Sequence, residues 1–140
     1  YVFMMYTGLR RSELASVEID DNWITLTTGK QRKGMKEKSR SLPISPMLRK
    51  VLPFIDVEKI KTAPIRVLTD RIKDVFENHH LHDLRHTGIT SAQECGIRRE
   101  IVSLWAGHKA DNSITTTDYP HLQERSELQL QEMEKYNYEY

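Results

Sequence analysis

The stretch WITLTTGKQRKGMKEKSRSLPI, residues 23–44, decides the fold class of this chain. Its first six residues, WITLTT (23–28), combine alternation with β-branched side chains, a pattern that predicts a strand. Gly29 ends this strand, a basic loop follows, and RSLPI (40–44) is predicted to return as a second strand. Because proline has no N–H for a sheet ladder, Pro43 favours an edge position. The stretch therefore predicts an antiparallel hairpin with a long basic tip.

The segments on either side of the hairpin have helical character. Residues 1–7 are apolar, with Gly8 as the expected break, and RRSELASV (10–17) is predicted to resume a helix. Three residues are predicted to face inward here, namely Leu9, Leu14 and Val17. Ser45 followed by Pro46 is typical of a helix start, in which serine caps the first turn and proline takes the first helical position.

The remainder of the chain predicts further helices. The first has Thr69 or Asp70 near its cap and carries an apolar stripe of Leu68, Ile72, Val75 and Phe76. A second contains HDLRHTGIT (82–90) and ends at Gly96, and RREIVSLWAG (98–107) is a third that ends at its final glycine. We also expect a cap at Asp111 or Asn112 and a last amphipathic helix with Leu122, Leu128, Leu130 and Met133. The predicted fold class is α+β, mainly α-helical with a small antiparallel β-sheet.

Length and composition favour one compact domain. The chain has 140 residues, of which 38% are hydrophobic and 29% charged, typical of a folded soluble protein. It contains no apolar run of the about 20 residues that would span a bilayer. A single cysteine, Cys95, excludes an internal disulfide and suits a reducing cytosol. The sequence YVFMMYTGLRR (1–11) has the pattern of a helix whose first residues are missing. We therefore expect residues 1–140 to be a fragment that lacks an upstream domain.

The net charge of +1 conceals an uneven distribution. From Gln123 onward two basic residues face five acids, so this tail carries −3 and residues 1–122 carry +4. In the hairpin one acid, Glu37, is outnumbered by Lys30, Arg32, Lys33, Lys36, Lys38 and Arg40. A segment of +5 is a candidate contact for a polyanion such as DNA, although a solvated hairpin surface would have the same composition.

The stretch HDLRHTGIT places His82, Arg85 and His86 at i, i+3 and i+4, on one face of the expected helix. A histidine pair at this spacing can bind zinc, but the metalloprotease signature also needs a glutamate that is absent here. A guanidinium in the same cluster repels a cation. An anion site fits better, because arginine presents a planar fork to two phosphate oxygens. An exposed polar helix is the remaining alternative.

Three motifs resemble those of the tyrosine recombinases, the phage-integrase family. They are TGLRRSEL (7–14), HDLRHT (82–87) and WAGHKADNSITTTDYPHL (105–122), and they occur in the order found in that family. The resemblance covers nearly the whole chain and implies the catalytic-domain fold of the family. It also implies that the missing upstream part is the domain that binds the DNA core site.

The resemblance implies a role for each matched residue. Arg10, rather than Arg11, and Arg85 would bind the scissile phosphate, with His82 and His108 beside them, and Tyr119 would be the nucleophile. The family also takes a lysine from the hairpin, for which Lys30 is the first choice and Lys33 the alternative. The basic residues left to contact DNA are Arg32, Lys33, Lys36 and Lys38.

The chemistry implied by the resemblance needs neither metal nor cofactor. Cationic side chains would neutralise the charge that develops on the phosphate oxygens, and a cationic pocket would lower the pKa of Tyr119 from its ordinary value near 10. His82 would accept the proton and Lys30 would protonate the leaving 5′-hydroxyl. The product is a covalent 3′-phosphotyrosine, which a second strand can reverse without ATP.

The implied function is site-specific recombination or integration by a phage or another mobile element. Its partners would be double-stranded DNA at an attachment or crossover site and three further copies in a homotetramer, in the cytoplasm of a bacterial host and not at a membrane. The tail, residues 122–140, would be exchanged between protomers or, alternatively, pack on its own domain. The isolated fragment would be a monomer.

Other functions remain open at this point. Within the same chemistry they are a chromosome-dimer resolvase and a type IB-like topoisomerase. Outside it they are a non-catalytic DNA-binding module and a zinc hydrolase built on His82 and His86.

Overall fold

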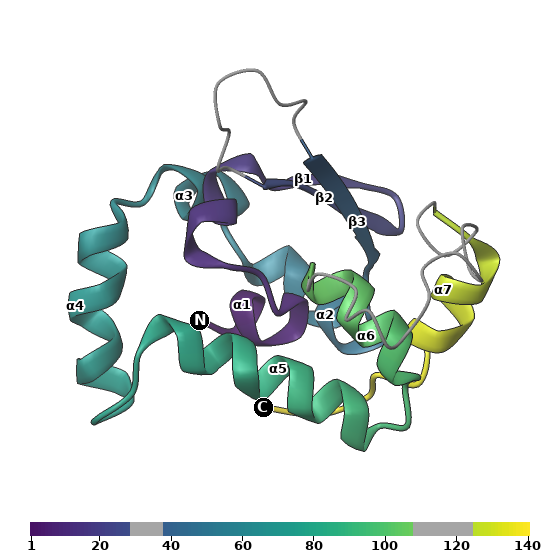
Figure 1. The fold of residues 1–140 in the computed structure, drawn as a ribbon. Coiled ribbons are helices and arrows are strands. Elements are labelled where there is room, and N and C mark those ends of the chain that lie inside the picture. The colour runs from purple at the N-terminus through teal and green to yellow at the C-terminus, as the bar shows by residue number, and fades with distance from the viewer. Residues whose placement is uncertain (29–37, 108–124) are drawn as a thin grey trace.

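The computed structural model describes residues 1–28, 38–107 and 125–140, which form a mainly helical fold with one three-stranded antiparallel sheet (Figure 1). The predicted α+β class is therefore confirmed. The elements in chain order are α1 (Val2–Thr7), the 3-10 helix η1 (Arg11–Ser16), β1 (Glu18–Asp20), β2 (Trp23–Thr28), β3 (Lys38–Pro43), α2 (Pro46–Val51), the 3-10 helix η2 (Leu52–Phe54), α3 (Val57–Thr62), α4 (Ile65–Val75), α5 (Leu81–Glu94), α6 (Arg99–Ala106) and α7 (Glu127–Met133).

The sheet contains the predicted hairpin and one strand more. The strands lie in the order β1-β2-β3, and Trp23 pairs with Pro43, so the proline is on an edge strand as predicted. The second strand of the hairpin begins two residues earlier than predicted, at Lys38. The added strand, β1, pairs with β2 through the register Glu18 to Thr25. With three residues it is too short to show alternation in the sequence.

Side chains from the sheet and the surrounding helices form the buried core. Leu9, Leu14 and Val17 all face inward as predicted, with exposures of 0%, 3% and 1%. They pack with Ile24 and Leu26 of β2 in the same cluster of buried residues. On the side of the molecule away from the sheet, α5 runs along α1 (Figure 1). The core therefore lies between the sheet and α5, with α1 in the middle.

Local signals predicted most helix ends correctly. The Ser45 hydroxyl accepts the N–H of Leu48 at 3.1 Å, so serine caps α2 and Pro46 opens it. The three glycines expected to end helices all have positive φ, namely Gly8, Gly96 and Gly107. The expected cap at Asp111 or Asn112 lies outside the described residues.

Two predictions about local structure were wrong. Helix α4 begins at Ile65 after Pro64, so Thr69 does not cap it, and its hydroxyl bonds the Ile65 carbonyl within the helix at 2.8 Å. Asp70 likewise lies in the helix interior. The apolar stripe of α4 is also narrower than predicted, because Val75 is 58% exposed whereas Ile72 is fully buried.

The segment RRSELASV was predicted to be helical, and its residues Arg11–Ser16 form the 3-10 helix η1 rather than a turn of α-helix. Two tertiary contacts accompany this tighter winding. The Ser16 hydroxyl bonds the carbonyl and the N–H of Thr27 on β2, both at 3.0 Å, and Glu13 is turned into the interior with 1% exposure. These contacts fix η1 against the sheet.

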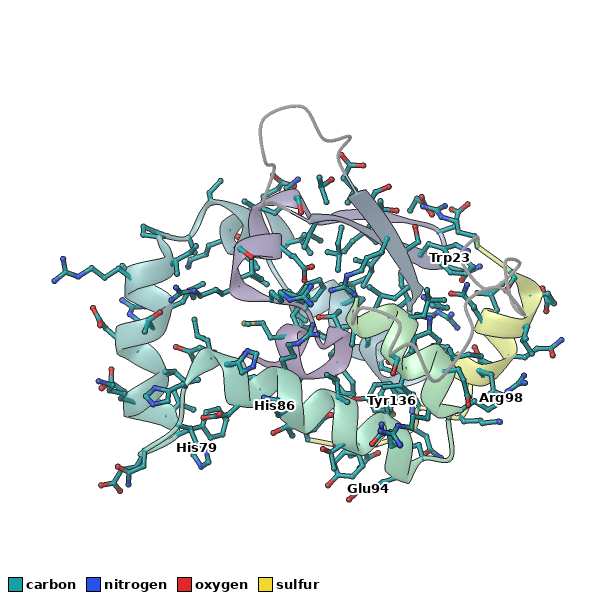
Figure 2. All side chains as sticks on the ribbon, in the orientation of Figure 1. Trp23, His79, His86, Glu94, Arg98 and Tyr136 are labelled. Carbon is teal, nitrogen blue, oxygen red and sulfur yellow. The ribbon has the colours of Figure 1, made fainter. Side chains whose placement is uncertain are left out.

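The described part of the tail packs on its own chain. Met133 and Tyr136 are buried, and the Tyr136 hydroxyl donates to the Gly88 carbonyl of α5 at 3.0 Å. The Trp105 indole N–H donates to the Gln129 side chain at 3.1 Å, which joins α6 to α7. Figure 2 shows Tyr136 beneath the middle of the molecule, beside α5. Residues 125–140 therefore pack on their own chain in this structure of one copy, and exchange of residues 122–140 between protomers stays a prediction.

Candidate anion-binding site

The site is built around the carboxylate of Glu13. This carboxylate accepts the backbone N–H of Arg10 at 2.7 Å and forms ion pairs with Arg10 Nη1 at 3.1 Å and Arg40 Nη2 at 2.7 Å. Arg10 lies at the start of η1 and Arg40 lies on β3. Since Glu13 is almost fully buried, it holds two guanidinium groups from different elements in fixed positions.

A third guanidinium reaches the same place from α5. Arg85 is 2% exposed and donates to the carbonyls of Gly8 and Ala106, the latter at 2.6 Å. Arg10 Nη2 donates to the next carbonyl, that of Gly107, at 2.9 Å. The C-terminal carbonyls of a helix attract cations. Arg10 and Arg85 therefore meet at the end of α6, and we call Arg10, Glu13, Arg40 and Arg85 the arginine cluster.

Gly107 allows the guanidinium groups to approach the end of α6. Its φ of 62° is in the left-handed region, which favours glycine. A Cβ at this position would lie 2.9 Å from Arg40 Nε and 3.3 Å from Arg10 Nη1. The absence of a side chain therefore lets Arg10 and Arg40 lie against the same residue.

The arginine cluster carries an excess of positive charge. The cluster contains three guanidinium groups and one carboxylate, which gives a formal charge of +2, and no acidic side chain of the described residues forms an ion pair with Arg85. Burial, together with the positive charges of Arg10 and Arg40, lowers the pKa of Arg85 to about 10. The cost of gathering these charges falls when an anion binds among them.

The carboxylate remains ionised despite its burial. Burial acts to raise the pKa of Glu13, but the hydrogen bond and the charge of Arg40, followed by the contacts with Arg10, outweigh it and hold that pKa below its usual value. Burial also lowers the pKa of Arg40, whereas Glu13 opposes that shift. The pair is thus charged on both sides at neutral pH.

His82 lies one turn before Arg85 on α5 and is exposed. Partial desolvation, then the charges of His86 and Arg85, lower the pKa of His82, and a smaller contribution comes from Arg10. The rings of His82 and His86 meet edge to face with centroids 4.5 Å apart. A histidine that is neutral at neutral pH and adjoins a cationic cluster can accept a proton.

The histidines do not gather into a metal site in the described part of the chain. His79 precedes α5 and His86 lies on it (Figure 2), and His79 Nδ1 lies 3.6 Å from the carboxylate of Asp83. No group of three or more histidine, cysteine, aspartate or glutamate side chains in residues 1–28, 38–107 and 125–140 could hold a metal ion.

Three of the six predicted catalytic residues are described, and the structure brings them together: Arg10 and Arg85 in the arginine cluster, and His82 beside it. The other three, Lys30, His108 and Tyr119, lie outside the described residues. The same holds for three of the predicted DNA contacts, namely Arg32, Lys33 and Lys36. Lys38 is placed as the first residue of β3, paired with Thr28.

Arg40 was counted as one charge of the basic hairpin, and its place in the cluster was missed. A usable signal was present, because residues two apart on a strand share a face. Leu42 of the predicted strand RSLPI is an apolar core candidate, and it is 1% exposed in the structure. Arg40 shares the face of Leu42, and its side chain is 9% exposed.

Comparison of the chain with family models, curated proteins and solved structures finds no match. Within the described residues, no helix has both the length and the apolar character needed to cross a membrane. The argument for function therefore rests on the geometry and chemistry of the arginine cluster.

Proposed function

We propose that this chain is the catalytic domain of a tyrosine-recombinase-like enzyme that cleaves and rejoins DNA strands, as an integrase of a phage or another mobile element does. One observation carries the proposal. Arg85 and Arg10 come from separate motifs and donate to consecutive carbonyls, Arg85 to that of Ala106 at 2.6 Å and Arg10 to that of Gly107 at 2.9 Å. Ala106 and Gly107 belong to the third motif (105–122), so residues of all three motifs meet at the end of α6.

The cluster suits the stabilisation of a phosphoryl transition state without a metal. A guanidinium has five N–H donors. Arg85 uses two of its N–H groups on backbone carbonyls of the described residues, which fix the plane of its side chain. The remaining donors, with those of Arg10, can bind the non-bridging oxygens on which negative charge develops.

In the proposed reaction the Tyr119 oxygen attacks phosphorus, the bond to the 5′-oxygen breaks, and a 3′-phosphotyrosine forms. His82, whose pKa is lowered, accepts the proton of the attacking hydroxyl. Lys30, with Lys33 as the alternative, gives a proton to the departing 5′-oxygen. Attack by a free 5′-hydroxyl of a second strand reverses the step and joins the strands.

The proposal extends to the assembly. The substrate is double-stranded DNA at a specific attachment or crossover site, bound in the cytoplasm of a bacterial host by four copies of the chain. The exchange of residues 122–140 between protomers on DNA would require the contacts of α7 with α6 to open first, because Trp105 and Gln129 join the two helices in the single chain.

A non-catalytic DNA-binding module is the second candidate, and one observation favours it. Arg10 and Arg85 already bind backbone carbonyls at the ends of α1 and α6, which is also what purely structural arginines do. The two candidates differ in the product they form. A binding module retains DNA without a covalent bond, whereas a recombinase leaves protein attached to a cleaved strand.

The test uses a duplex with a nick placed so that the released 5′-segment diffuses away and traps the adduct. We expect a covalent protein–DNA species that resists chelator and disappears in Tyr119→Phe, whereas Tyr138→Phe retains it. Arg10→Ala should reduce the adduct by orders of magnitude, and Arg11→Ala, which removes an exposed neighbouring charge, should not. DNA retention without any adduct would favour the binding module. Loss of the adduct on chelation would refute a metal-free mechanism.

A further inference from the structure

One nitrogen of the Arg40 guanidinium, Nη1, has no hydrogen-bond partner in the described part of the chain. Arg40 Nε lies 3.4 Å and Nη2 2.7 Å from the two oxygens of Glu13, whereas the buried Nη1 makes no hydrogen bond. The side chain is 9% exposed, so this donor is removed from bulk water. A buried donor that is left without an acceptor costs free energy even when the rest of its group is paired. Such a donor calls for a partner that the described residues do not provide.

The position of Arg40 indicates what that partner is. Arg40 and Arg10 both lie against Gly107, and the cluster around them has a formal charge of +2. A ligand that satisfied Nη1 would have to be an acceptor and would be stabilised by negative charge. Glu13 meanwhile accepts hydrogen bonds from the other two nitrogens of Arg40, Nε and Nη2, and so fixes the orientation of the guanidinium group.

We propose that Arg40 is a third phosphate-binding guanidinium of this site, whose Nη1 donates to a non-bridging oxygen of the DNA phosphodiester alongside Arg10 and Arg85. This inference rests on the proposed function for the identity of the ligand. Glu13 acts as the positioning residue for Arg40, to which it is joined by a bidentate contact. The competing explanation is that the Glu13–Arg40 pair only ties η1 to β3.

A double variant separates these explanations, because it removes the guanidinium without changing the net charge. Wild type has three arginines and one glutamate in the cluster, and Glu13→Gln/Arg40→Gln has two arginines and no glutamate, so both carry +2. Replacing both members of a buried ion pair together is also far less destabilising than removing one. Circular dichroism checks that the variant is folded.

The probe is dimethyl phosphate, a phosphodiester without bases, titrated at constant ionic strength against sodium chloride and followed by the NMR shift of the Gly107 amide. We expect the wild type to bind and the double variant to bind at least about tenfold more weakly. Arg11→Gln, which removes an exposed charge, should bind as the wild type does. Equal affinity in the double variant, or no binding by the wild type, would overturn the inference.

Should the double variant fail to fold, Arg40→Lys keeps the charge and replaces the fork by a single ammonium. It should bind dimethyl phosphate several-fold more weakly, and unchanged affinity would overturn the inference. The adduct assay reports separately on the proposed function. If phosphate binding depends on Arg40 but the protein forms no adduct, the phosphate-binding role of Arg40 stands and the proposed recombinase activity is refuted. If the double variant forms the adduct as well as the wild type does, the proposed recombinase activity stands and a role for Arg40 is refuted.

Discussion

Replacing Glu13 by glutamine should destabilise the fold strongly, although the two side chains have nearly the same shape. The carboxylate lies 2.7 Å from the Arg10 N–H, 2.7 Å from Arg40 Nη2 and 3.1 Å from Arg10 Nη1. In Glu13→Gln the three guanidinium groups of the cluster would carry +3 with no carboxylate among them. An amide can also accept only at its oxygen, and its NH₂ group would face a cation.

The size of the expected loss of stability follows from how deeply Arg10 and Arg40, the two partners of Glu13, are buried. Breaking a buried ion pair by removing one member costs about 3–5 kcal/mol. The Arg10 side chain is 39% exposed, so solvent screens its ion pair with Glu13. The Arg40 side chain is 9% exposed, so its ion pair with Glu13 is screened much less. We therefore expect a loss near the lower limit, about 3 kcal/mol. For a chain of this size that loss lowers the melting temperature by about 10 °C.

Urea unfolding measures the loss through the fluorescence of Trp23 and Trp105, which are 8% and 4% exposed. The matched control is Glu18→Gln, which removes the same charge from an exposed position and should change stability by less than about 0.5 kcal/mol. A loss below about 1 kcal/mol in Glu13→Gln at pH 7 would refute the ion-pair argument, because it would mean that the carboxylate does not hold the cluster.

The difference in stability between wild type and Glu13→Gln should depend on pH. The pKa of Glu13 is lower in the folded chain than its ordinary value of 4.5, because the contacts with Arg40 and Arg10 outweigh burial. Between those two pKa values the unfolded chain binds the proton more strongly, so stability falls as the pH falls. The contribution is complete above about pH 5 and is lost as the pH falls through the folded pKa. The difference between wild type and Glu13→Gln should therefore shrink in acid, and a difference independent of pH would contradict this.

Three further variants test other contacts by urea unfolding. Gly107→Ala adds a Cβ 2.9 Å from Arg40 Nε at a φ of 62°, so it should cost about 1–3 kcal/mol and weaken dimethyl phosphate binding; a neutral result would contradict the close approach. Gly88→Ala places a Cβ 2.0 Å from the Met5 carbonyl oxygen, so α1 and α5 must separate and the loss should reach about 3 kcal/mol or more. Arg125→Ala removes a bidentate but exposed ion pair with β1, at 2.7 and 3.1 Å, and should cost less than about 1 kcal/mol.

Features that depend on a few neighbouring residues were predictable. Ser45 and Pro46 determine the start of α2 because a hydroxyl and a missing N–H act within one turn. Glycine ends α6 at Gly107 for an equally local reason. Strand β1 and the 3-10 winding of η1 were not predictable, because they depend on pairing with β2 and on the bonds between Ser16 and Thr27.

The candidate site was predictable only in part, and the reason is also physical. The motifs indicate Arg10 and Arg85 as site residues. Their spacing along the chain, however, does not indicate that both reach the end of α6. Arg40 was overlooked because charge counting treats all basic residues of the hairpin alike. Strand alternation separates them, since the face that buries Leu42 also carries Arg40.

The structural roles of these arginines and their proposed catalytic roles support each other. Stabilising a transition state requires hydrogen-bond donors that are already oriented when the charge appears. A long side chain that is free in water does not hold its donors in one orientation. Arg85 is held by carbonyls at the ends of α1 and α6, and Arg40 is held by Glu13. Each of these contacts uses some donors of a guanidinium and leaves others in fixed directions, which a lysine ammonium on a flexible stem does not provide. Substituting lysine for arginine in this cluster should therefore retain the charge and still weaken phosphate binding.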